Sequence, residues 1–324
     1  MSITHAAESP ADRWQGPAEK SVAFEHPALF YRNTTEYLNG TLAFVFDGLS
    51  RGDAVLIAVP AAKLSLIADQ LGRDAELVRL VDLSQAGRNP GRILGGVLRT
   101  FADDNPDQWV RIVGEPLWAE RSPAEYAACA QHEALINRAF AGRAVSMLCP
   151  YDTQTLDSRA LIDAVRTHPV VLDADRRQDS ASYAPEQVLA DYNQPLRAPK
   201  DATEFTVRAE HLRQLRTGAD DIATAAGLNE DGRVDWSLVL TELVTNSIEH
   251  SDGRAVVRMF TEGRDLVGQV SDAGDLTDPL AGRHPALPGQ VRGRGLMIVH
   301  DLADLVRLHT RPGATTVEVR FRIG

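Results

Sequence analysis

The chain has 324 residues, of which 44% are hydrophobic and 24% charged, and its formal net charge is −11. This length favours two domains, and the absence of an apolar leader or of an apolar run of about 18 residues makes membrane insertion and export unexpected, so a cytoplasmic location is predicted. An acidic chain without a basic stripe is a poor candidate for direct nucleic-acid binding, and two cysteines without CxxC spacing indicate neither a disulfide framework nor a structural zinc site.

The first half of the chain is predicted to be one α/β domain. Residues 1–23 are polar and rich in Ala, Ser and Pro, which predicts a flexible N-terminus. Over residues 24–175 short apolar runs alternate with helical patterns. Strands are expected at 54–60, 77–83, 109–115, 144–152 and 169–175, and helices at 61–71, 91–103, 123–141 and 157–167. This alternation predicts a mostly parallel sheet with helices on both faces.

The second half has a different pattern. Residues 176–202 are polar and interrupted by prolines, which predicts a linker. Beyond the linker we expect a strand at 203–208 and helices at 209–226 and 235–250. A hairpin at 254–272, a long loop at 273–291, a helix at 295–305 and a second hairpin that turns around 311–313 should follow. Helices separated from antiparallel hairpins indicate an α+β sandwich over 203–324.

The helix at 235–250 carries a polar line. At 100° per residue, Glu242, Asn246 and Glu249 fall on one arc and the apolar residues on the other. Taken alone, this pattern is typical of a solvated helix face. His250 lies at the helix end, where the helix dipole explains a histidine without any chemistry.

Two later segments favour a ligand site over a solvated face. The stretch "VSDAGD" ends a strand with Asp272 and breaks it at Gly274. Gly293 and Gly295 immediately precede a helix, whose N-terminal N–H groups are suited to phosphate. Loop 273–291, with three prolines and three glycines, is predicted to be a lid or binding loop, with a disordered insertion as the alternative.

In this order "ELVTNSIEHS", "DAG" and "GRGLMIV" resemble the N, G1 and G2 boxes of the GHKL ATPase superfamily, and especially its anti-sigma-factor serine kinases of the RsbW and SpoIIAB type. The resemblance covers 203–324 and implies a Bergerat-type sandwich that binds ATP and Mg²⁺. It implies that Asn246 coordinates Mg²⁺, that Glu242 is the general base toward a partner serine, and that Asp272 accepts a hydrogen bond from adenine. The other implied ATP contacts are Gly274, Gly293, Arg294, Gly295 and Thr315 or Thr316.

One box departs from the family pattern. The full G1 box is DxGxG, but here the residues after Asp272 read Ala273, Gly274, Asp275 and Leu276. The second glycine is missing, and Asp275 adds a carboxylate where phosphates would pass. This departure weakens the prediction of nucleotide binding and leaves kinase activity open.

The first half lacks the phosphate-binding loop GxxxxGK[ST], so ATP hydrolysis is not expected there. The segments "HPALFY", "GEPLW", "YAACAQHEALINRAF" and "CPYD" resemble the MEDS sensory domain, a relative of RecA- and KaiC-type ATPases. The predicted sensory pocket lies at the strand C-terminal ends and contains His26, Glu115, Trp118, Cys149 and Asp152. Three of them have a plain alternative: Trp118 as a core aromatic, His26 as a structural histidine and Cys149 as an inert buried thiol. The spacing of His26, Cys129, His132 and Cys149 matches no metal-ligand pattern, so a metal site is not expected.

Together the resemblances imply an anti-sigma regulatory factor with four parts: 1–23, a MEDS-like sensory domain at 24–175, a linker at 176–202 and an ATPase domain at 203–324. Such a protein would sequester an alternative sigma factor and phosphorylate a serine of a STAS-domain anti-anti-sigma factor, as a homodimer controlled by a small-molecule signal. The alternative is a non-catalytic interaction module with a degenerate ATPase fold. A histidine kinase is not expected, because no dimerisation helix pair with an acceptor histidine precedes the ATPase pattern.

Overall fold

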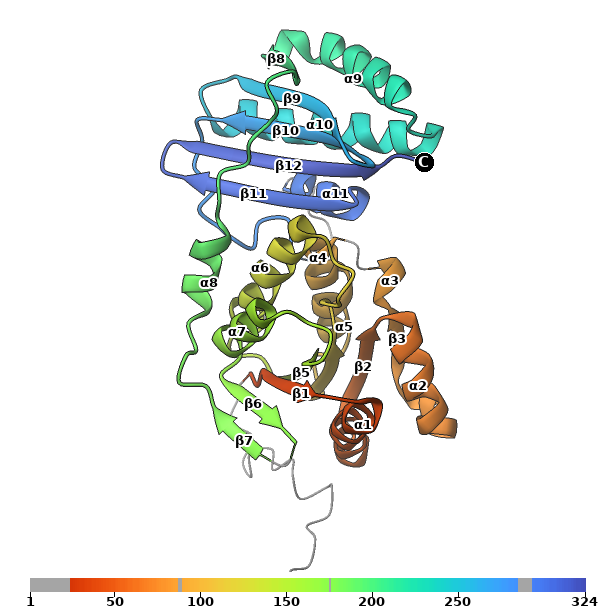
Figure 1. Ribbon diagram of the computed structural model, residues 1–324. Helices are drawn as coiled ribbons and strands as arrows, with labels where there is room; N and C mark the ends of the chain where they lie inside the picture. The colour runs from red at the N-terminus through yellow and green to blue at the C-terminus, as the bar shows by residue number, and fades with distance from the viewer. Residues whose placement is uncertain (1–23, 87–88, 175, 285–292) are drawn as a thin grey trace, which may run out of the picture. The chain divides into compact units, whose positions relative to one another are not determined.

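The computed structural model describes residues 24–86, 89–174, 176–284 and 293–324, and the predicted flexible segment 1–23 lies outside this range. The chain forms two compact units (Figure 1). One comprises Met1–Gly87 with Phe101–Val188, and the other comprises Arg88–Thr100 with Leu189–Gly324. Within the described ranges, no helix is long and apolar enough to cross a bilayer.

The N-terminal unit is built on a seven-stranded sheet with the order β3-β2-β4-β5-β1-β6-β7. Neighbouring strands are parallel except for the final β6–β7 pair. The predicted mostly parallel sheet is therefore confirmed. The strands are β1 (Pro27–Tyr31), β2 (Ala54–Val59), β3 (Arg79–Asp82), β4 (Val110–Gly114), β5 (Val145–Asp152), β6 (Val170–Asp173) and β7 (Arg176–Asp179).

Local signals in the sequence explain where the helices of this unit begin. The Asn33 side chain accepts a hydrogen bond from the Glu36 N–H at the start of α1, and Ser122 and Glu125 form a reciprocal capping box at the start of α6. Asp157 caps α7 in the same way. The helices are α1 (Thr34–Arg51), α2 (Ala61–Leu71), α3 (Leu83–Ala86), α5 (Thr100–Asp104), α6 (Pro123–Ala139), α7 (Ser158–Thr167) and α8 (Pro185–Tyr192), with a 3₁₀ helix at Gly72–Leu77.

Three parts of this half differ from the sequence-based expectation. Strand β1 and helix α1 were not predicted, although β1 pairs with both β5 and β6 inside the sheet. The expected linker 176–202 contains strand β7 and helix α8. The expected single helix at 91–103 is divided into α4 (Pro90–Arg92), a π-helix at Ile93–Arg99 and α5.

The C-terminal unit contains an antiparallel five-stranded sheet with the order β11-β12-β10-β9-β8. Burial alternates along β9, as expected of a sheet with one face covered. The strands are β8 (Thr203–Val207), β9 (Ala255–Glu262), β10 (Asp265–Asp272), β11 (Leu305–Arg311) and β12 (Ala314–Arg322). The helices are α9 (Leu212–Ala226), which follows a 3₁₀ turn at Ala209–His211, α10 (Glu230–His250) and α11 (Gly295–Leu302). The α+β sandwich is confirmed.

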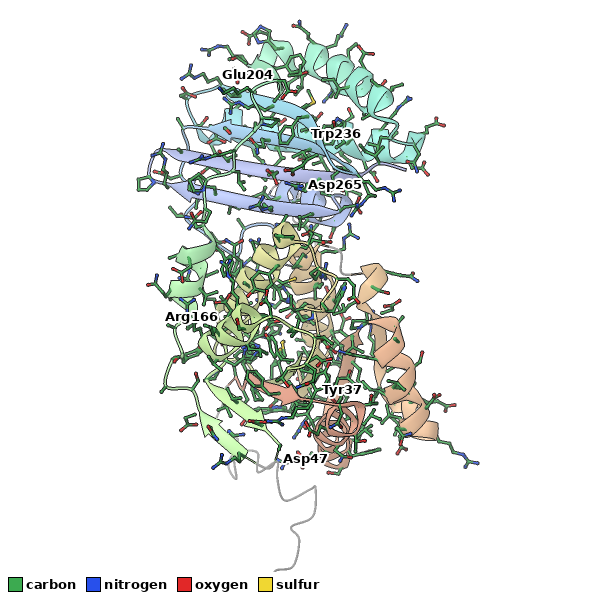
Figure 2. The ribbon with its side chains drawn as sticks, viewed as in Figure 1. Tyr37, Asp47, Arg166, Glu204, Trp236 and Asp265 are labelled. Carbon is green, nitrogen blue, oxygen red and sulfur yellow. The ribbon has the colours of Figure 1, made fainter. Side chains whose placement is uncertain are left out.

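Trp236 anchors α10 on this sheet (Figure 2). Its side chain is fully buried and meets the Phe321 ring edge to face, with the ring centroids 5.4 Å apart. A Cβ atom on Gly268 would lie 2.8 Å from the indole, so β10 has room for the tryptophan only because this residue is glycine. Helix α10 begins at Glu230, before the predicted start, because Asn229 caps it by accepting a hydrogen bond from the Gly232 N–H at 2.8 Å.

Residues 89–92 belong to the C-terminal unit and pack against α11. The Asn89 amide donates to the His300 carbonyl at 2.9 Å, and Arg92 Nη2 donates to the Ala303 carbonyl at 3.3 Å. A Cβ atom on Gly91 would collide with the His300 ring. His300 is buried, and burial together with Arg283 and Arg92 holds the pKa of its imidazole well below its usual value, so the contact is made by a neutral ring.

Candidate functional site

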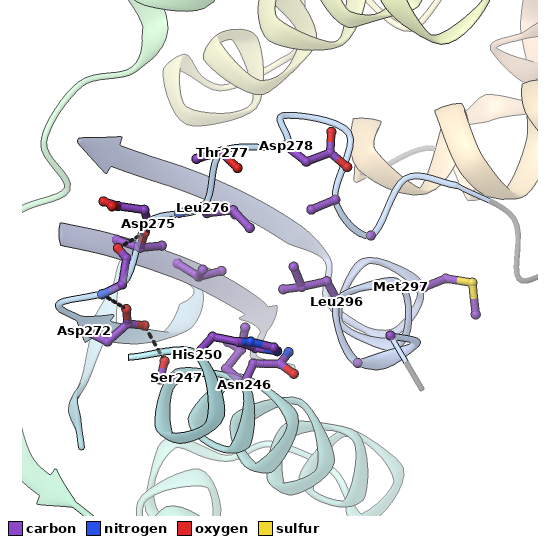
Figure 3. Close-up of a pocket in the computed structure, with 18 of the residues that line it drawn as sticks. Asn246, Ser247, His250, Asp272, Asp275, Leu276, Thr277, Asp278, Leu296 and Met297 are labelled. Atoms are coloured by element: carbon purple, nitrogen blue, oxygen red, sulfur yellow. Dashed lines mark hydrogen bonds between the residues drawn. The ribbon is translucent and has the colours of Figure 1, made fainter. Parts of the chain in front are cut away.

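A cavity of about 560 Å³ opens where the end of α10, the end of β10 and the start of α11 meet (Figure 3). This volume falls in the range of small-molecule sites. Of the polar line of α10, Asn246 lines this cavity, whereas Glu249 is exposed. The lining includes Asn246, Ser247, His250, Asp272, Gly274, Asp275, Leu276, Thr277, Asp278, His284, Gly293, Arg294, Gly295, Leu296, Met297 and Thr315.

The Asp272 carboxylate is held in one orientation from both sides (Figure 3). Ser247 Oγ donates to its Oδ2 at 2.5 Å, and the Gly274 N–H donates to its Oδ1 at 2.7 Å. A carboxylate oxygen accepts more than one hydrogen bond, so each oxygen keeps capacity for a ligand donor. Asp272 is thus a preoriented acceptor at the cavity wall.

Gly274 fits a tight corner that a side chain would fill. A Cβ atom there would lie 2.9 Å from Asp272 Oδ1 and 2.9 Å from the His250 carbonyl. Thr315, which pairs with Asp272 across the β10–β12 ladder, donates from Oγ1 to the Gly274 carbonyl at 2.9 Å. Thr316 faces away and pairs with Ser271 Oγ at 2.9 Å. Of the two candidate threonines, only Thr315 is among the described residues that line the cavity.

The start of α11 comes very close to α10. A Cβ atom on Gly295 would lie 2.8 Å from Glu242 Oε2 and 2.9 Å from Asn246 Nδ2. Gly293 has φ 79°, a left-handed conformation that favours glycine, and lines the cavity beside the exposed Arg294. Glu242 is half-buried next to Gly295, but it is not among the described residues that form the cavity wall.

The carboxylate added by the incomplete G1 box is bonded to the protein. Asp275 Oδ1 accepts the Gly313 N–H at 2.5 Å at the turn between β11 and β12. Arg283 donates from Nη1 to the Pro279 carbonyl at 2.8 Å, and it is not among the described lining residues. Arg294, in contrast, is among the described residues that line the cavity. Residues 285–291 of the predicted binding loop lie outside the described part of the chain.

The five residues predicted as a sensory pocket do not share one edge of the sheet. His26 precedes β1, whereas Glu115 follows β4 and Asp152 ends β5. His26 and Cys149 do meet, with Nε2 and Sγ 3.4 Å apart. Trp118 is half-buried rather than part of the core, and the Arg121 guanidinium stacks 3.7 Å from its ring centroid.

Glu115 is part of a separate buried cluster at the strand C-terminal ends. Lys63 Nζ donates to both Glu115 Oε1 and Tyr31 Oη, and Tyr31 Oη also donates to Glu115 Oε1 at 3.3 Å. Burial raises the pKa of Glu115 to about 7, against the opposing effect of Lys63. Lys63 is thus the partner of a buried carboxylate.

His26 is a buried neutral imidazole. Burial and the nearby His168 lower its pKa to about 4, against the opposing effect of Glu133. Burial also raises the pKa of the Cys149 thiol well above its usual value. Both residues lie in one cluster with Glu133 and His168.

Comparison with known families matches this division of the chain. Residues 25–169 match the model of the MEDS domain, described as MEthanogen/methylotroph, DcmR Sensory domain. Residues 205–321 match the histidine kinase-like ATPase domain. The chain carries a MEDS domain followed by a histidine-kinase-like ATPase domain. The π-helix at Ile93–Arg99 lies inside the MEDS match, although it belongs to the C-terminal unit.

Two solved structures resemble parts of the chain. The crystal structure of the RsbU and RsbW domains of Rv1364c from Mycobacterium tuberculosis has 20% identity and a TM-score of 0.30, covering 39% of this chain and 33% of that one. The Acinetobacter baumannii histidine kinase AdeS has 13% identity and a TM-score of 0.24, covering 43% of this chain and 81% of that one. The chain therefore spans about a third of the length of the first structure. No curated protein matches.

Sequence reasoning missed Ser247, which orients Asp272. The only available signal was its place in the helix: Ser247 is buried although it follows the polar Asn246, and a buried hydroxyl needs a partner. Thr277 and Asp278 were also missed, because a loop pattern does not indicate which of its side chains point inward.

Proposed function

We propose that the protein binds ATP with Mg²⁺ in the cavity between α10, β10 and α11. The observation that supports this most is the convergence of three sequence-distant groups on one cavity: the amide of Asn246, the preoriented carboxylate of Asp272 and the glycine start of α11. An acceptor for a base, an oxygen ligand for a hard cation and a helix N-terminus for phosphate are the parts that a nucleotide site needs.

The residues present fit a magnesium nucleotide. Gly295 lets the start of α11 come close to the Asn246 amide, because a Cβ atom there would lie 2.9 Å from Asn246 Nδ2. Asn246 would hold the cation, Asp272 would accept from the adenine amine, and Gly293, Arg294 and Gly295 would contact phosphate. When bound, Mg²⁺ supplies charge neutralisation to the phosphates. Gly274 keeps the wall next to Asp272 free of a side chain.

Calorimetric titration with Mg-ATP tests this site. Asn246→Ala and Asp272→Asn should each weaken binding by about tenfold or more, because each removes a hydrogen-bonding or ligating group from a charged contact. Asp252→Asn is the matched control, since Asp252 is exposed just beyond α10 and pairs only with Arg254 among the contacts that the structure describes. Equal binding by all four proteins, or none by the wild type, would reject the assignment.

We also propose a regulatory role for the protein. We infer that the protein is an anti-sigma regulatory factor, acting as a cytoplasmic homodimer that sequesters an alternative sigma factor and phosphorylates a serine of a STAS-domain anti-anti-sigma factor. The family match to a histidine kinase-like ATPase domain and the sequence resemblance of its boxes to anti-sigma kinases support this inference. Glu242, half-buried beside Gly295, would act as the general base toward the partner serine.

We infer that the MEDS domain controls this activity through residues 89–92. They lie inside the MEDS match yet pack on α11, whose first residue is Gly295 at the cavity. A small molecule bound by the MEDS domain would then alter the start of α11 through this segment. Affinity purification from native cells with mass spectrometry would identify the sigma factor and the antagonist.

A non-catalytic interaction module is the second candidate. It is favoured by one observation, that Glu242 is absent from the described wall of the cavity. Incubation with radiolabelled ATP and STAS-domain proteins distinguishes the two. Phosphoserine that disappears in Glu242→Gln supports the kinase, whereas retained sigma-factor binding without phosphoserine supports the module.

A further inference from the structure

Four buried side chains converge in the N-terminal unit, at a place not explained by the nucleotide site. They come from four elements: His26 before β1, Glu133 on α6, Cys149 in β5 and His168 at the end of α7. One potential ligand atom from each residue lies within 4.8 Å of all the others. None of the four residues is more than 3% exposed.

The separations between these atoms match the edges of a tetrahedron around a metal ion. His26 Nε2 lies 3.5 Å from Glu133 Oε2 and 3.4 Å from Cys149 Sγ, and His168 Nε2 lies 3.4 Å from Glu133 Oε2. Zinc bonds to nitrogen, oxygen and sulfur of about 2.0 to 2.3 Å imply ligand separations of roughly 3.3 to 3.8 Å in a tetrahedron. The remaining pairs lie within 4.8 Å and need to close by at most about 1.5 Å to meet this geometry.

Both histidines are oriented as metal ligands are. His26 Nδ1 lies 3.1 Å from the Asn137 amide oxygen, and His168 Nδ1 lies 2.8 Å from the Ala164 carbonyl. An acceptor at Nδ1 fixes the proton there, which leaves the lone pair on Nε2. Both Nε2 atoms then direct lone pairs at the Glu133 carboxylate, an arrangement that is repulsive unless a cation lies between them.

The cluster also has the hydrogen-bonding deficit expected of a metal site. Among the described residues, Glu133 Oε1, Glu133 Oε2 and His168 Nε2 are buried without a hydrogen-bond partner. Such orphaned polar atoms are costly and call for an explanation. A divalent cation would satisfy them, and with a thiolate, a carboxylate and two neutral imidazoles the complex would be neutral overall, which suits full burial.

We propose that His26, Glu133, Cys149 and His168 bind one zinc-type divalent transition-metal ion in tetrahedral geometry. Imidazole with a thiolate favours zinc over magnesium or calcium, which prefer oxygen ligands. The ion would connect the starts of β1 and β6 to β5 and α6, so the MEDS domain would require it for full stability. The proposal corrects the sequence-based expectation of no metal site: His26 and Cys149 are ligands, whereas Cys129 and His132 are not part of the cluster.

The two cysteines provide a matched pair for the test. Cys149 is a proposed ligand, whereas the Cys129 thiol, equally buried on α6, donates to the Pro116 carbonyl at 3.4 Å. The full-length chain is produced in medium with cobalt in place of zinc, which avoids any refolding step. Tetrahedral Co²⁺ gives intense visible bands, and a thiolate ligand adds a charge-transfer band in the near ultraviolet.

We expect one cobalt ion per chain, with the charge-transfer band present in the wild type and in Cys129→Ser and absent in Cys149→Ser. In Cys129→Ser the sole remaining thiol is Cys149, so this variant assigns the ligand even if Cys149→Ser does not fold. Metal content well below one ion per chain in both zinc-grown and cobalt-grown wild type would overturn the proposal. A band that is lost in a folded Cys129→Ser, or bound metal without any thiolate band, would overturn it equally.

A second measurement separates a metal site from a purely structural cluster. Asn137→Ala removes the partner of His26 Nδ1 and should weaken the metal about 10- to 100-fold in competition with a chromophoric chelator. Asn105→Ala is the control. The side-chain amides of Asn137 and Asn105 each donate to a backbone carbonyl, but Asn105 lies outside the cluster. Equal metal affinity in the two variants would contradict the assigned orientation of His26.

Discussion

Replacing Gly295 by alanine should separate folding from nucleotide binding. Gly295 is the first residue of α11, and its φ is not in the left-handed region, so alanine fits the backbone. The new Cβ atom would lie 2.8 Å from Glu242 Oε2 and 2.9 Å from Asn246 Nδ2, closer than such atoms normally approach. Both contacts are ends of flexible side chains, so those side chains must move rather than the helices.

The expected energies differ in size for the two properties. Alanine gains about 0.5 to 1 kcal/mol over glycine in a helix, while an off-rotamer side chain costs about 0.5 to 1.5 kcal/mol. The free energy of unfolding should therefore change by less than about 1 kcal/mol. Displacing Asn246 removes a contact to a charged ligand worth about 1.5 to 3 kcal/mol, which corresponds to roughly 10- to 150-fold weaker Mg-ATP binding.

Urea denaturation measures the first quantity and calorimetric titration with Mg-ATP the second. Gly96→Ala is the matched control: Gly96 is also helical and exposed, and a Cβ atom there meets only Arg92 Cγ, at 3.9 Å. The control should bind Mg-ATP as the wild type does. If Gly295→Ala is stable and binds Mg-ATP as tightly as Gly96→Ala, Asn246 does not contact the nucleotide and the proposed site is wrong.

Three further changes have expected outcomes. Thr315→Val should weaken Mg-ATP binding about two- to tenfold by calorimetry, because the Thr315 hydroxyl donates to the Gly274 carbonyl. Thr316→Val should leave Mg-ATP binding unchanged. Equal effects of the two changes would count against the assigned cavity wall. Burial raises the pKa of Glu115 from 4.5 to about 7, so the folded state binds this proton more tightly than the unfolded state. The free energy of unfolding should therefore fall by about 3 kcal/mol as pH rises from 4.5 to about 7. Chemical denaturation of Glu115→Gln should lack this dependence on pH. An unchanged dependence in this variant would contradict its assignment to Glu115. Trp236→Ala should cost about 3 to 5 kcal/mol in urea denaturation, since it empties a fully buried site, and a loss below about 1 kcal/mol would mean that the core collapses around it.

The C-terminal half could be predicted closely because its signals are local. The hairpins are predicted by alternating apolar residues and by the turn residues at 311–313. Helix α10 is predicted by apolar residues that recur with a period of 3.6 residues. The strand that ends at Asp272 and the helix that starts at Gly295 were expected where they occur. Which of Thr315 and Thr316 faces the cavity was left open, because the face of a strand residue depends on register with β10, and register is a tertiary property.

The N-terminal half was predicted less completely for a physical reason. Strand β1 is short and begins with proline, so "PALFY" has no alternation to mark it as a strand. Its strand character comes from parallel neighbours on both sides. Polar residues in the expected linker similarly hide β7, which is exposed along its length and pairs with β6.

The buried cluster in the MEDS domain shows why spacing alone could not reveal it. Its ligands lie 107, 16 and 19 residues apart in the chain, intervals that match no metal motif. They meet because β1 lies between β5 and β6. This strand order places His26 next to Cys149 and next to His168, which lies two residues before β6. Helix α6, which follows β4, then supplies Glu133 from outside the sheet. A site of this kind is encoded by strand order, so a change that disrupts β1 pairing should abolish metal binding even when all four ligands remain.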